Sequence, residues 1–386
     1  MIVAVVGGGQ LARMMAPAAT ALGVTLRVLV ESPTASAALA AHEVVVGSPS
    51  DPAAIRQLLA APRPDVVTWE HEHIPSEVFA ACAGAGVATR PEASALLHAQ
   101  DKIAMRTRLA ALGVPGPMWR AVSTLSDVSE FLADAGGKAV IKTARGGYDG
   151  KGVRVVTAAD DVADWLANAR DGGPRLLAEE AVDFDRELAI QVARRPSGEI
   201  RAWPVVESIQ RDGVCSEVIA PAPDFSPIAE REVRRMAELI ATKLDVTGVL
   251  TVEMFQAGER ILVNELAMRP HNSGHWSIDG AVTSQFEQHL RAVLDVPLGD
   301  TTPLSPVAVM ANVLGGAREV LPLALGDIVD GGAKVHLYGK EVRPGRKVGH
   351  VTVTGDEVDE VYRRAVDAAA IVRDGARAPA RRTEKR

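Results

Sequence analysis

The residues best suited to chemistry lie between positions 253 and 276, in the stretch EMFQAGERILVNELAMRPHNSGHW. Glu253 and Glu265 each follow an apolar run, and a Gly-containing turn separates the two runs. This pattern predicts a β-hairpin that brings both carboxylates and the amide of Asn264 close together. Mg²⁺ prefers oxygen ligands and usually takes one or two carboxylates plus phosphate oxygens. The stretch therefore predicts a magnesium–phosphate site at which ATP is split.

Cations and hydrogen-bond donors follow the carboxylates directly. Arg269, His271, Asn272 and His275 stand in a Gly-containing loop. Groups of this kind beside a metal–phosphate site suit an anionic reactant. The loop therefore predicts a second binding place next to the ATP.

A second glycine-rich segment, AVIKTARGGYDGKGVRVV, reads as two strands joined by a loop, with Lys142 at the end of the first strand. Glycines let backbone N–H groups approach phosphate oxygens, and Lys142 supplies a point charge. The segment lacks the GKS/T of a Walker A loop and the HRD and DFG of a kinase. We interpret it as a loop over a triphosphate; a surface lysine beside a turn is the alternative.

The next strand, in RLLAEEAVDF, ends at Glu179 and Glu180. The backbone of a strand that links two lobes can pair with an adenine edge, and Glu187 could take ribose hydroxyls. Solvated acidic side chains are the alternative.

The first 95 residues alternate strands and helices, which predicts a parallel sheet with ligands at the carboxyl ends of its strands. Gly7, Gly9 and Ala12, with Glu31 after the second strand, match a dinucleotide fingerprint only weakly. We favour a substrate phosphate there over a dinucleotide or a structural turn. The loop WEHEHIP, led by Glu70 and Glu72, is interpreted as a substrate contact rather than a solvated loop or a zinc site.

The remaining pattern divides the chain. Glu92–Leu112 reads as one long helix, and the cationic turn YGKEVRPGRKVGH predicts an anion contact near the C-terminus. The expected domains are an N-terminal α/β (Rossmann-like) unit over 1–95, a linker helix and small lid over 96–182, a large subdomain over 183–295, a β-rich unit over 296–375 and a tail over 376–386.

Composition restricts the class of protein. The chain has 386 residues, of which 47% are hydrophobic and 24% charged, as in a globular protein of two or three domains. A net charge of −7 gives no general basic field for nucleic acid. Two cysteines without metal-type spacing fit a reducing cytoplasm, and no apolar run approaches the ~18 residues of a membrane helix.

Taken together, the motifs GGGQLARM, VVTWEHEHIP, VIKTARGGYDGKG, VNELAMRPHNSGHW and RPGRKVGH resemble the 5-(carboxyamino)imidazole ribonucleotide synthase family of the ATP-grasp superfamily. The resemblance implies an α/β (α+β) ATP-grasp fold with a parallel-sheet pre-ATP-grasp domain and a small C-terminal β-rich domain. It implies a ligase of purine biosynthesis in which ATP phosphorylates bicarbonate, and carboxyphosphate then carboxylates the amine of aminoimidazole ribonucleotide. ATP and Mg²⁺, with Mn²⁺ as an alternative ion, and a homodimer are implied as well.

The resemblance also assigns roles to residues. Glu253 and Glu265 would bind the metal ion. The ATP-binding set would be Lys102, Lys142, Gly147, Tyr148, Asp149, Gly150, Lys151, Gly152, Val153, Glu179, Glu180, Ala181, Val182, Glu187, Gln210, Asn264 and Glu265. The catalytic set would be Tyr148, Asp149, Arg269, His271, His275 and Lys347, and the substrate-binding set Gln10, Glu70, Lys340, Arg346 and Lys347.

Two positions depart from the pattern, because Lys102 replaces a common arginine and Gln210 replaces a histidine that contacts ATP in some relatives. Lys102 keeps the charge but loses the planar guanidinium fork. An ATP-grasp enzyme that uses formate or an amino acid, and a nicotinamide-dependent oxidoreductase built on GGGQLA, are the competing functions.

Overall fold

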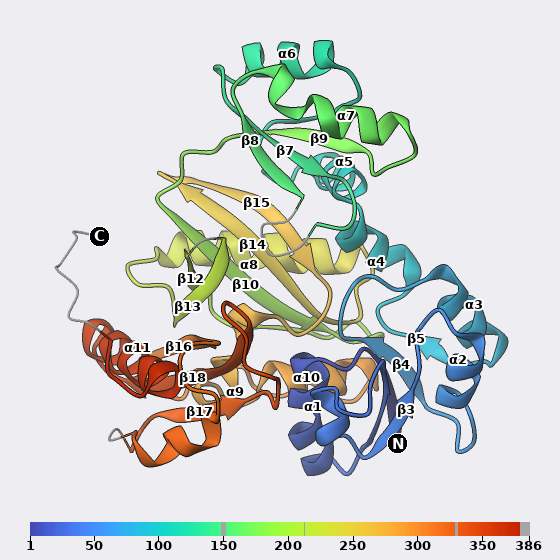
Figure 1. The fold of residues 1–386 in the computed structure, drawn as a ribbon, viewed down its shortest axis with the longest axis vertical. Helices are drawn as coiled ribbons and strands as arrows, with labels where there is room; N and C mark the ends of the chain where they lie inside the picture. The colour runs from blue at the N-terminus through green and yellow to red at the C-terminus, as the bar shows by residue number, and fades with distance from the viewer. Residues whose placement is uncertain (148–151, 212, 329–330, 379–386) are drawn as a thin grey trace.

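The computed structural model describes residues 1–147, 152–211, 213–328 and 331–378. Figure 1 shows three lobes around a central sheet, with the N-terminal lobe and the C-terminal helix on opposite sides of the base. Within the described residues, no helix combines the length and apolar character needed to cross a membrane.

The N-terminal lobe is the expected parallel sheet, with strand order β3-β2-β1-β4-β5. Its three inner strands are rich in valine and leucine and are buried on both faces, as a sheet covered by helices requires, whereas Val44 and Val46 of an edge strand are exposed. The strands are β1 (Ile2–Val6), β2 (Thr25–Val30), β3 (Glu43–Val46), β4 (Val66–Trp69) and β5 (Ala88–Thr89), with helices α1 (Gln10–Ala21), α2 (Pro52–Leu58) and α3 (Ser76–Gly84) and the short 3₁₀ helix η1 (Ala37–Leu39).

The prediction of one long helix over Glu92–Leu112 is wrong, because the structure has two helices, α4 (Ala93–Gln100) and α5 (Lys102–Ala111). Asp101 between them is extended, and its side chain accepts hydrogen bonds from the amides of Ile103 and Ala104. An aspartate at this position caps the second helix and so ends the first. The break turns the start of α5 toward the site described below.

The lid lobe, residues 115 to 182, holds a four-stranded antiparallel sheet of order β6-β9-β7-β8. Its apolar core, which includes Phe131 and Ile141, is separate from those of the other lobes. The elements are β6 (Trp119–Val122), α6 (Leu125–Asp134), β7 (Ala139–Thr143), β8 (Val153–Val156), η2 (Ala159–Val162), α7 (Ala163–Arg170) and β9 (Leu176–Glu180).

A nine-stranded sheet forms the centre, in the order β15-β14-β10-β12-β13-β16-β18-β17, with β11 paired to β10. The C-terminal strands join it through the pairing of β13 with β16, so they extend this sheet. The strands are β10 (Arg186–Arg194), β11 (Ile200–Ala202), β12 (Val206–Arg211), β13 (Val214–Ala220), β14 (Gly248–Ala257), β15 (Arg260–Ala267), β16 (Val307–Leu314), β17 (Lys334–Leu337) and β18 (Lys347–Gly355).

Helices cover this sheet and join it to the N-terminal lobe. Phe286, Leu290 and Val293 of α10 pack into the core that contains Leu11 and Met15 of α1, and the two helices lie side by side in Figure 1. The remaining elements are α8 (Pro227–Lys243), η3 (Asn272–Gly274), α9 (Ser277–Gly280), α10 (Gln285–Val293), η4 (Leu321–Gly326) and α11 (Val358–Asp374).

Candidate functional site

The hairpin of β14 and β15 places Glu253 directly opposite Glu265, as the sequence predicts. The register shifts after Glu253, so the hairpin is irregular where its carboxylates lie. Lys102 Nζ lies 2.9 Å from Glu265 Oε1 and reaches it from the first turn of α5. Lys142 Nζ, from β7 of the lid lobe, donates to Asn264 Oδ1 at 3.1 Å. Helix α5 and strand β7 therefore each bring a lysine to the hairpin, one to Glu265 and one to the neighbouring Asn264.

A buried ion-pair network supports this arrangement, and the sequence analysis did not assign its central residue. Arg106 is 2% exposed, and its Nε lies 2.6 Å from Glu179 Oε1. Its remaining nitrogens donate to the backbone oxygens of Val263 and Asn264 on β15. Lys142 Nζ contacts the other oxygen of Glu179 at 2.7 Å. Arg106 thus joins α5, β9 and β15. The only sequence feature that could have pointed to this role is its position, one helical turn after Lys102.

The acids themselves are crowded. Burial, together with the charges of Glu265 and Glu187, raises the pKa of Glu253 to about 8 against the opposing charges of Arg269 and Lys347. Burial also raises the pKa of Glu187 to about 7, against the opposing charge of Lys142. A bound cation would relieve such crowding between like charges.

The donor set fits Mg²⁺ better than a zinc ion. No group of three or more histidine, cysteine or acidic residues within the described part of the chain is arranged to hold a metal by itself. Glu253 and Glu265 supply two carboxylates, and Mg²⁺ commonly completes its shell with water and substrate phosphates. The same finding gives the loop WEHEHIP no support as a zinc site.

Beside the hairpin, the loop 269–275 carries the expected donors. Arg269 Nε lies 2.9 Å from Glu72 Oε2, so the N-terminal lobe fixes this guanidinium. His271 Nδ1 accepts from the amide of Ser273 at 3.3 Å, and its Nε2 lies 3.8 Å from Glu253 Oε1. A ring whose Nδ1 accepts a hydrogen bond carries its proton on Nε2 when neutral. Burial and the nearby charges of Arg269 and Lys347 lower the pKa of His271 well below its usual value.

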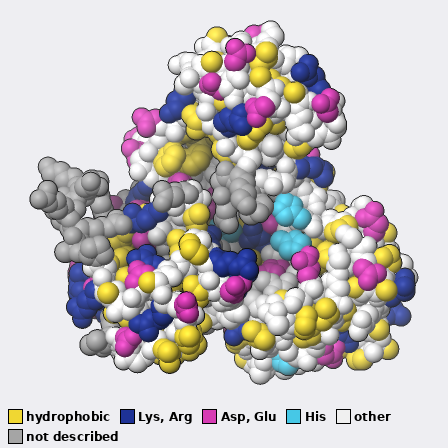
Figure 2. Space-filling model, viewed as in Figure 1, with side chains coloured by type: hydrophobic (Ala, Val, Ile, Leu, Met, Phe, Trp, Pro, Cys, Tyr) yellow, Lys and Arg dark blue, Asp and Glu magenta, His cyan; other side chains and the backbone are white. Residues whose placement is uncertain are grey.

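Figure 2 shows histidine side chains at the rim of a hollow in the middle of one face, next to lysine, arginine and acidic side chains; His275 of the loop is 0% exposed and is not among these surface side chains. Gly274 permits the loop to lie close against the sheet, because a Cβ there would come 1.9 Å from Gln191 Oε1. The fold therefore places a cationic, histidine-rich loop in close contact with the carboxylate hairpin.

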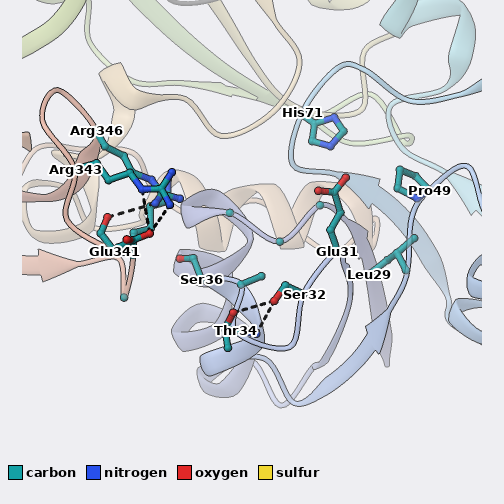
Figure 3. Close-up of a pocket in the computed structure, with 16 residues that line it drawn as sticks. Leu29, Glu31, Ser32, Thr34, Ser36, Pro49, His71, Glu341, Arg343 and Arg346 are labelled. Atoms are coloured by element: carbon teal, nitrogen blue, oxygen red, sulfur yellow. Dashed lines mark hydrogen bonds and ion pairs between the residues drawn. The ribbon is translucent and has the colours of Figure 1, made fainter. Parts of the chain in front are cut away.

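A cavity of about 560 Å³ lies between the N-terminal lobe and the turn after β17. In Figure 3, Arg343 and Arg346 face Ser32, Thr34 and Ser36 across it, with His71 and Glu31 at the other end. Lys340 hydrogen-bonds Gln10 Oε1, so the two predicted substrate residues meet at the cavity wall. Its lining is Gly7, Gly8, Gly9, Leu29, Glu31, Ser32, Thr34, Ala35, Ser36, Pro49, His71, Gly339, Lys340, Glu341, Arg343 and Arg346.

Glu70, which the sequence predicts to contact the substrate, binds backbone amides of the chain itself. Its carboxylate accepts from the amides of Gly9 and Leu11, at the start of α1. These amides are the groups that a phosphate at a helix start would use. They are occupied here, which favours the arginines and hydroxyls of the cavity as the phosphate contacts over the glycine turn.

The other predicted residues are placed as follows. Gly152 O accepts a hydrogen bond from the amide of Thr143 at 2.9 Å. This bond joins the two ends of the glycine-rich loop, which contains Gly147 and is followed by Val153. Tyr148, Asp149, Gly150 and Lys151 lie outside the described residues. Glu179 and Glu180 end β9, ahead of Ala181 and Val182, and Gln210 Nε2 donates to Ser208 Oγ on β12. Their roles toward ATP stay predictions.

The sequence matches three known domain families in succession. Residues 1–100 match the ribonucleotide synthetase preATP-grasp domain, 107–286 the ATP-grasp domain, and 308–364 the phosphoribosylaminoimidazole carboxylase C-terminal domain. The three matches together follow the lobes of the structure in chain order.

Named proteins match along nearly the whole chain. N5-carboxyaminoimidazole ribonucleotide synthase of Mycobacterium tuberculosis is 50% identical over 376 residues, which cover 95% of this chain and 87% of that protein. The crystal structure of the Thermus thermophilus synthetase superposes with a TM-score of 0.85 at 37% identity, covering 96% of this chain and 98% of that one. The Aspergillus clavatus synthase, in complex with ADP and 5-aminoimidazole ribonucleotide, gives 0.84 at 32% identity, covering 96% and 98%.

Proposed function

Because the chain belongs to the N5-carboxyaminoimidazole ribonucleotide synthase family, we propose that it carboxylates the amine of 5-aminoimidazole ribonucleotide with ATP and bicarbonate. In this reaction a bicarbonate oxygen takes the γ-phosphoryl group, which gives carboxyphosphate and ADP. Carboxyphosphate then releases phosphate and carbon dioxide. The amine nitrogen bonds to that carbon and loses one proton, which completes the carbamate.

The observation that carries the proposal is that Glu253 and Glu265 lie opposite each other on the hairpin. Lys102 contacts Glu265, and Lys142 contacts the adjacent Asn264. Glu253 and Glu265 would hold Mg²⁺, which supplies charge neutralisation at the phosphates when bound. Lys102 and Lys142 contact oxygens of Glu265 and Glu179, and both ammonium groups could exchange these partners for phosphate oxygens. Phosphoryl transfer depends mainly on positioning and charge, and this region supplies both.

The acceptor would lie on the loop side of the hairpin. Arg269 is held by Glu72, and Lys347 acts electrostatically on Glu253, His271 and His275. Two cations fixed beside neutral N–H donors would hold bicarbonate next to the transferred phosphoryl group. Enclosure by the surrounding lobes would protect carboxyphosphate from water.

The ribonucleotide would occupy the cavity of about 560 Å³, a volume within the ~300–1,000 Å³ usual for small-molecule sites. Arg343 and Arg346 line one side, and the hydroxyls of Ser32, Thr34 and Ser36 line the other. Guanidinium groups suit a phosphate because they can donate two parallel hydrogen bonds. Lys340 and Gln10, joined at the wall, would complete the substrate contacts.

A phosphate-release assay tests the proposal. With Mg²⁺-ATP, we expect release that requires both 5-aminoimidazole ribonucleotide and bicarbonate, and none with glycinamide ribonucleotide and formate. Turnover with the second pair, or none with the first, would replace this function with that of another ATP-grasp enzyme.

Two finer proposals accompany this function. We expect a homodimer, as the family resemblance implies, and light scattering of the purified protein should give twice the mass of the chain. We also expect a cytoplasmic enzyme, which is supported by two cysteines that are both buried and free.

A further inference from the structure

One buried side chain holds the loop 269–275 in place. Gln285, the first residue of α10, is 0% exposed. Its Oε1 accepts from the His271 amide at 2.7 Å and from Gln191 Nε2 at 2.8 Å. Its Nε2 lies 2.8 Å from both His271 O and His275 Nδ1. All four hydrogen-bonding capacities of this amide are therefore used.

The backbone of His271 fixes the direction of that amide. A backbone N–H can only donate and a backbone C=O can only accept, so Gln285 Oε1 must face the first and Nε2 the second. The second hydrogen on Nε2 then points to His275, whose Nδ1 must accept it. A neutral imidazole with an accepting Nδ1 carries its proton on Nε2. The tautomer of His275 follows from the network without further assumption.

The ring of His275 is also held neutral. It is 0% exposed, and burial, together with the charges of Lys347, His336 and Arg269, lowers its pKa to about 3. Within the described part of the chain, its Nε2 has no hydrogen-bond partner. A buried N–H without an acceptor is unfavourable, so this nitrogen is a candidate donor to a bound ligand.

A second buried histidine, His350, lies next to it. Its Nδ1 lies 2.8 Å from the hydroxyl of Tyr338; burial raises the pKa of Tyr338 and lowers that of His350, so both partners of this hydrogen bond are neutral. Its Nε2 is likewise without a partner among the described residues, and its ring centre lies 5.0 Å from that of His275. Tyr338 precedes Gly339 in the wall of the ribonucleotide cavity. Two neutral imidazole rings, each with an Nε2 that has no partner among the described residues, are thus buried side by side.

We propose that Gln285 is a positioning residue, whose amide holds His275 as the Nε2–H tautomer so that the ring donates to an oxygen of the one-carbon oxyanion. This inference rests on the proposed function, since that anion is its bicarbonate or carboxyphosphate. A neutral donor stabilises the anion without supplying an acidic proton that would protonate the amine nucleophile. Gln285 itself touches neither reactant and acts through His275.

The variant Gln285→Glu tests the tautomer. A carboxylate cannot donate to Nδ1, so it would accept a hydrogen bond from Nδ1–H and leave Nε2 as a lone pair on the neutral ring. Protonation of the ring would restore the Nε2–H donor. We expect kcat/KM for bicarbonate to fall about 10–100-fold at pH 8 and to recover as the pH is lowered, by analogy with the effect of removing the hydrogen-bond partner of a metal-bound histidine.

Two variants serve as controls. Gln288 lies on the same helix, is also 0% exposed, and binds the backbone of Gly299 rather than the loop. Gln288→Glu should show the pH profile of the wild-type enzyme even if it is less stable. Gln285→Met, which has no hydrogen-bonding groups, should lose activity at every pH without recovery at low pH.

A direct measurement does not depend on turnover. In ligand-free wild-type protein labelled with ¹⁵N-histidine, NMR should show His275 protonated on Nε2 and not on Nδ1, and the reverse in Gln285→Glu. A proton on Nδ1 in the wild type, or a pH profile of Gln285→Glu equal to that of Gln288→Glu, would overturn the inference. If Gln285→Glu does not fold, the wild-type spectrum alone decides. If the enzyme lacks bicarbonate-dependent turnover, the proposed function is refuted instead. The NMR measurement still reports the tautomer of His275 in that case, because it needs no turnover.

Discussion

The two sides of the site handle charge in opposite ways. Around the hairpin, Glu179, Glu265, Lys102, Lys142 and Arg106 carry formal charges, and each contacts an opposite charge within 3 Å. Around the loop 269–275, the buried rings of His275 and His350 are neutral, and the hydrogen bonds of Gln285 fix which nitrogen of His275 carries the proton.

This difference suggests different behaviour during a reaction cycle. Lysines that contact carboxylates can exchange those partners for phosphate oxygens, since an ammonium group is a point charge without strict geometry. A neutral hydrogen-bonded ring has no such exchange partner and stays where the network holds it. We therefore expect the hairpin to adapt to a nucleotide and the loop to be organised before an anion binds.

The largest effect is expected from breaking the buried charge network. Arg106→Met leaves Glu179, which is 2% exposed, without its guanidinium partner and leaves two backbone oxygens unpaired. Removing one partner of a buried pair typically destabilises by ~3–5 kcal/mol. Urea unfolding should show this loss, while Arg108→Met on the same helix, at an exposed hydrogen bond, should lose less than about 1 kcal/mol. Equal losses in the two variants would show that Arg106 has no special structural role.

The next effect concerns the chemistry at the hairpin. Glu265→Gln keeps the size of the side chain and removes one negative charge from the proposed metal pair. We expect a loss of about 100–1,000-fold in ATP cleavage with little change in stability, since removing one electrostatic contact to the transition state has effects of that order. Glu259→Gln, at the exposed turn of the same hairpin, is the control. Wild-type turnover by Glu265→Gln would exclude this carboxylate as a metal ligand.

A smaller effect should separate the loop side from the hairpin side. Lys347→Ala removes a charge that acts on His271 and His275. We expect KM for bicarbonate or for the ribonucleotide to rise about 10-fold, or ~1.4 kcal/mol, while KM for ATP changes little. Initial-rate kinetics with each substrate varied in turn would measure both. An equal rise for ATP would mean that Lys347 belongs to the nucleotide side.

Much of the fold and the core of the site could be predicted from the sequence. Apolar runs that end in Glu253 and Glu265 predicted the hairpin, and the structure confirms that the two acids face each other. Alternating strands and helices predicted the parallel N-terminal sheet. The motif order predicted the family, which the similarity to known synthases confirms. These features depend on local patterns, which the sequence displays directly.

The missed features depend on contacts between distant segments. Arg106 stands in an ordinary helix, and nothing near it in the chain shows that it meets Glu179. His350 ends the motif RPGRKVGH and Gln285 begins a helix, but their contacts appear only when α10 and β18 are packed beside the loop. Asp101 was read as part of one long helix because periodicity continues across it, although its side chain caps the second helix.

A final, smaller effect tests whether neutral histidines matter to stability as well as to chemistry. His289 is 0% exposed and binds the N-terminal lobe to the central sheet: its Nδ1 accepts from the amide of Val249 at 3.1 Å, and its Nε2 lies 2.8 Å from Thr68 Oγ1. Burial lowers its pKa from 6.5 to about 3. The unfolded chain therefore binds a proton below pH 6.5 that the folded chain refuses until near pH 3.

The stability contributed by this residue is complete above pH 6.5 and is lost as the pH falls through that window, at up to ~1.4 kcal/mol per pH unit. Urea unfolding at pH 7 and at pH 5.5 should show a smaller decline for His289→Asn than for the wild type, even though the variant is less stable at pH 7. His42→Asn, at an exposed histidine, should keep the wild-type decline. If His289→Asn declined as steeply as the wild type, the ring would have to accept its proton inside the folded protein. The contrast between charged hairpin and neutral interior would then not extend to the contact between the lobes.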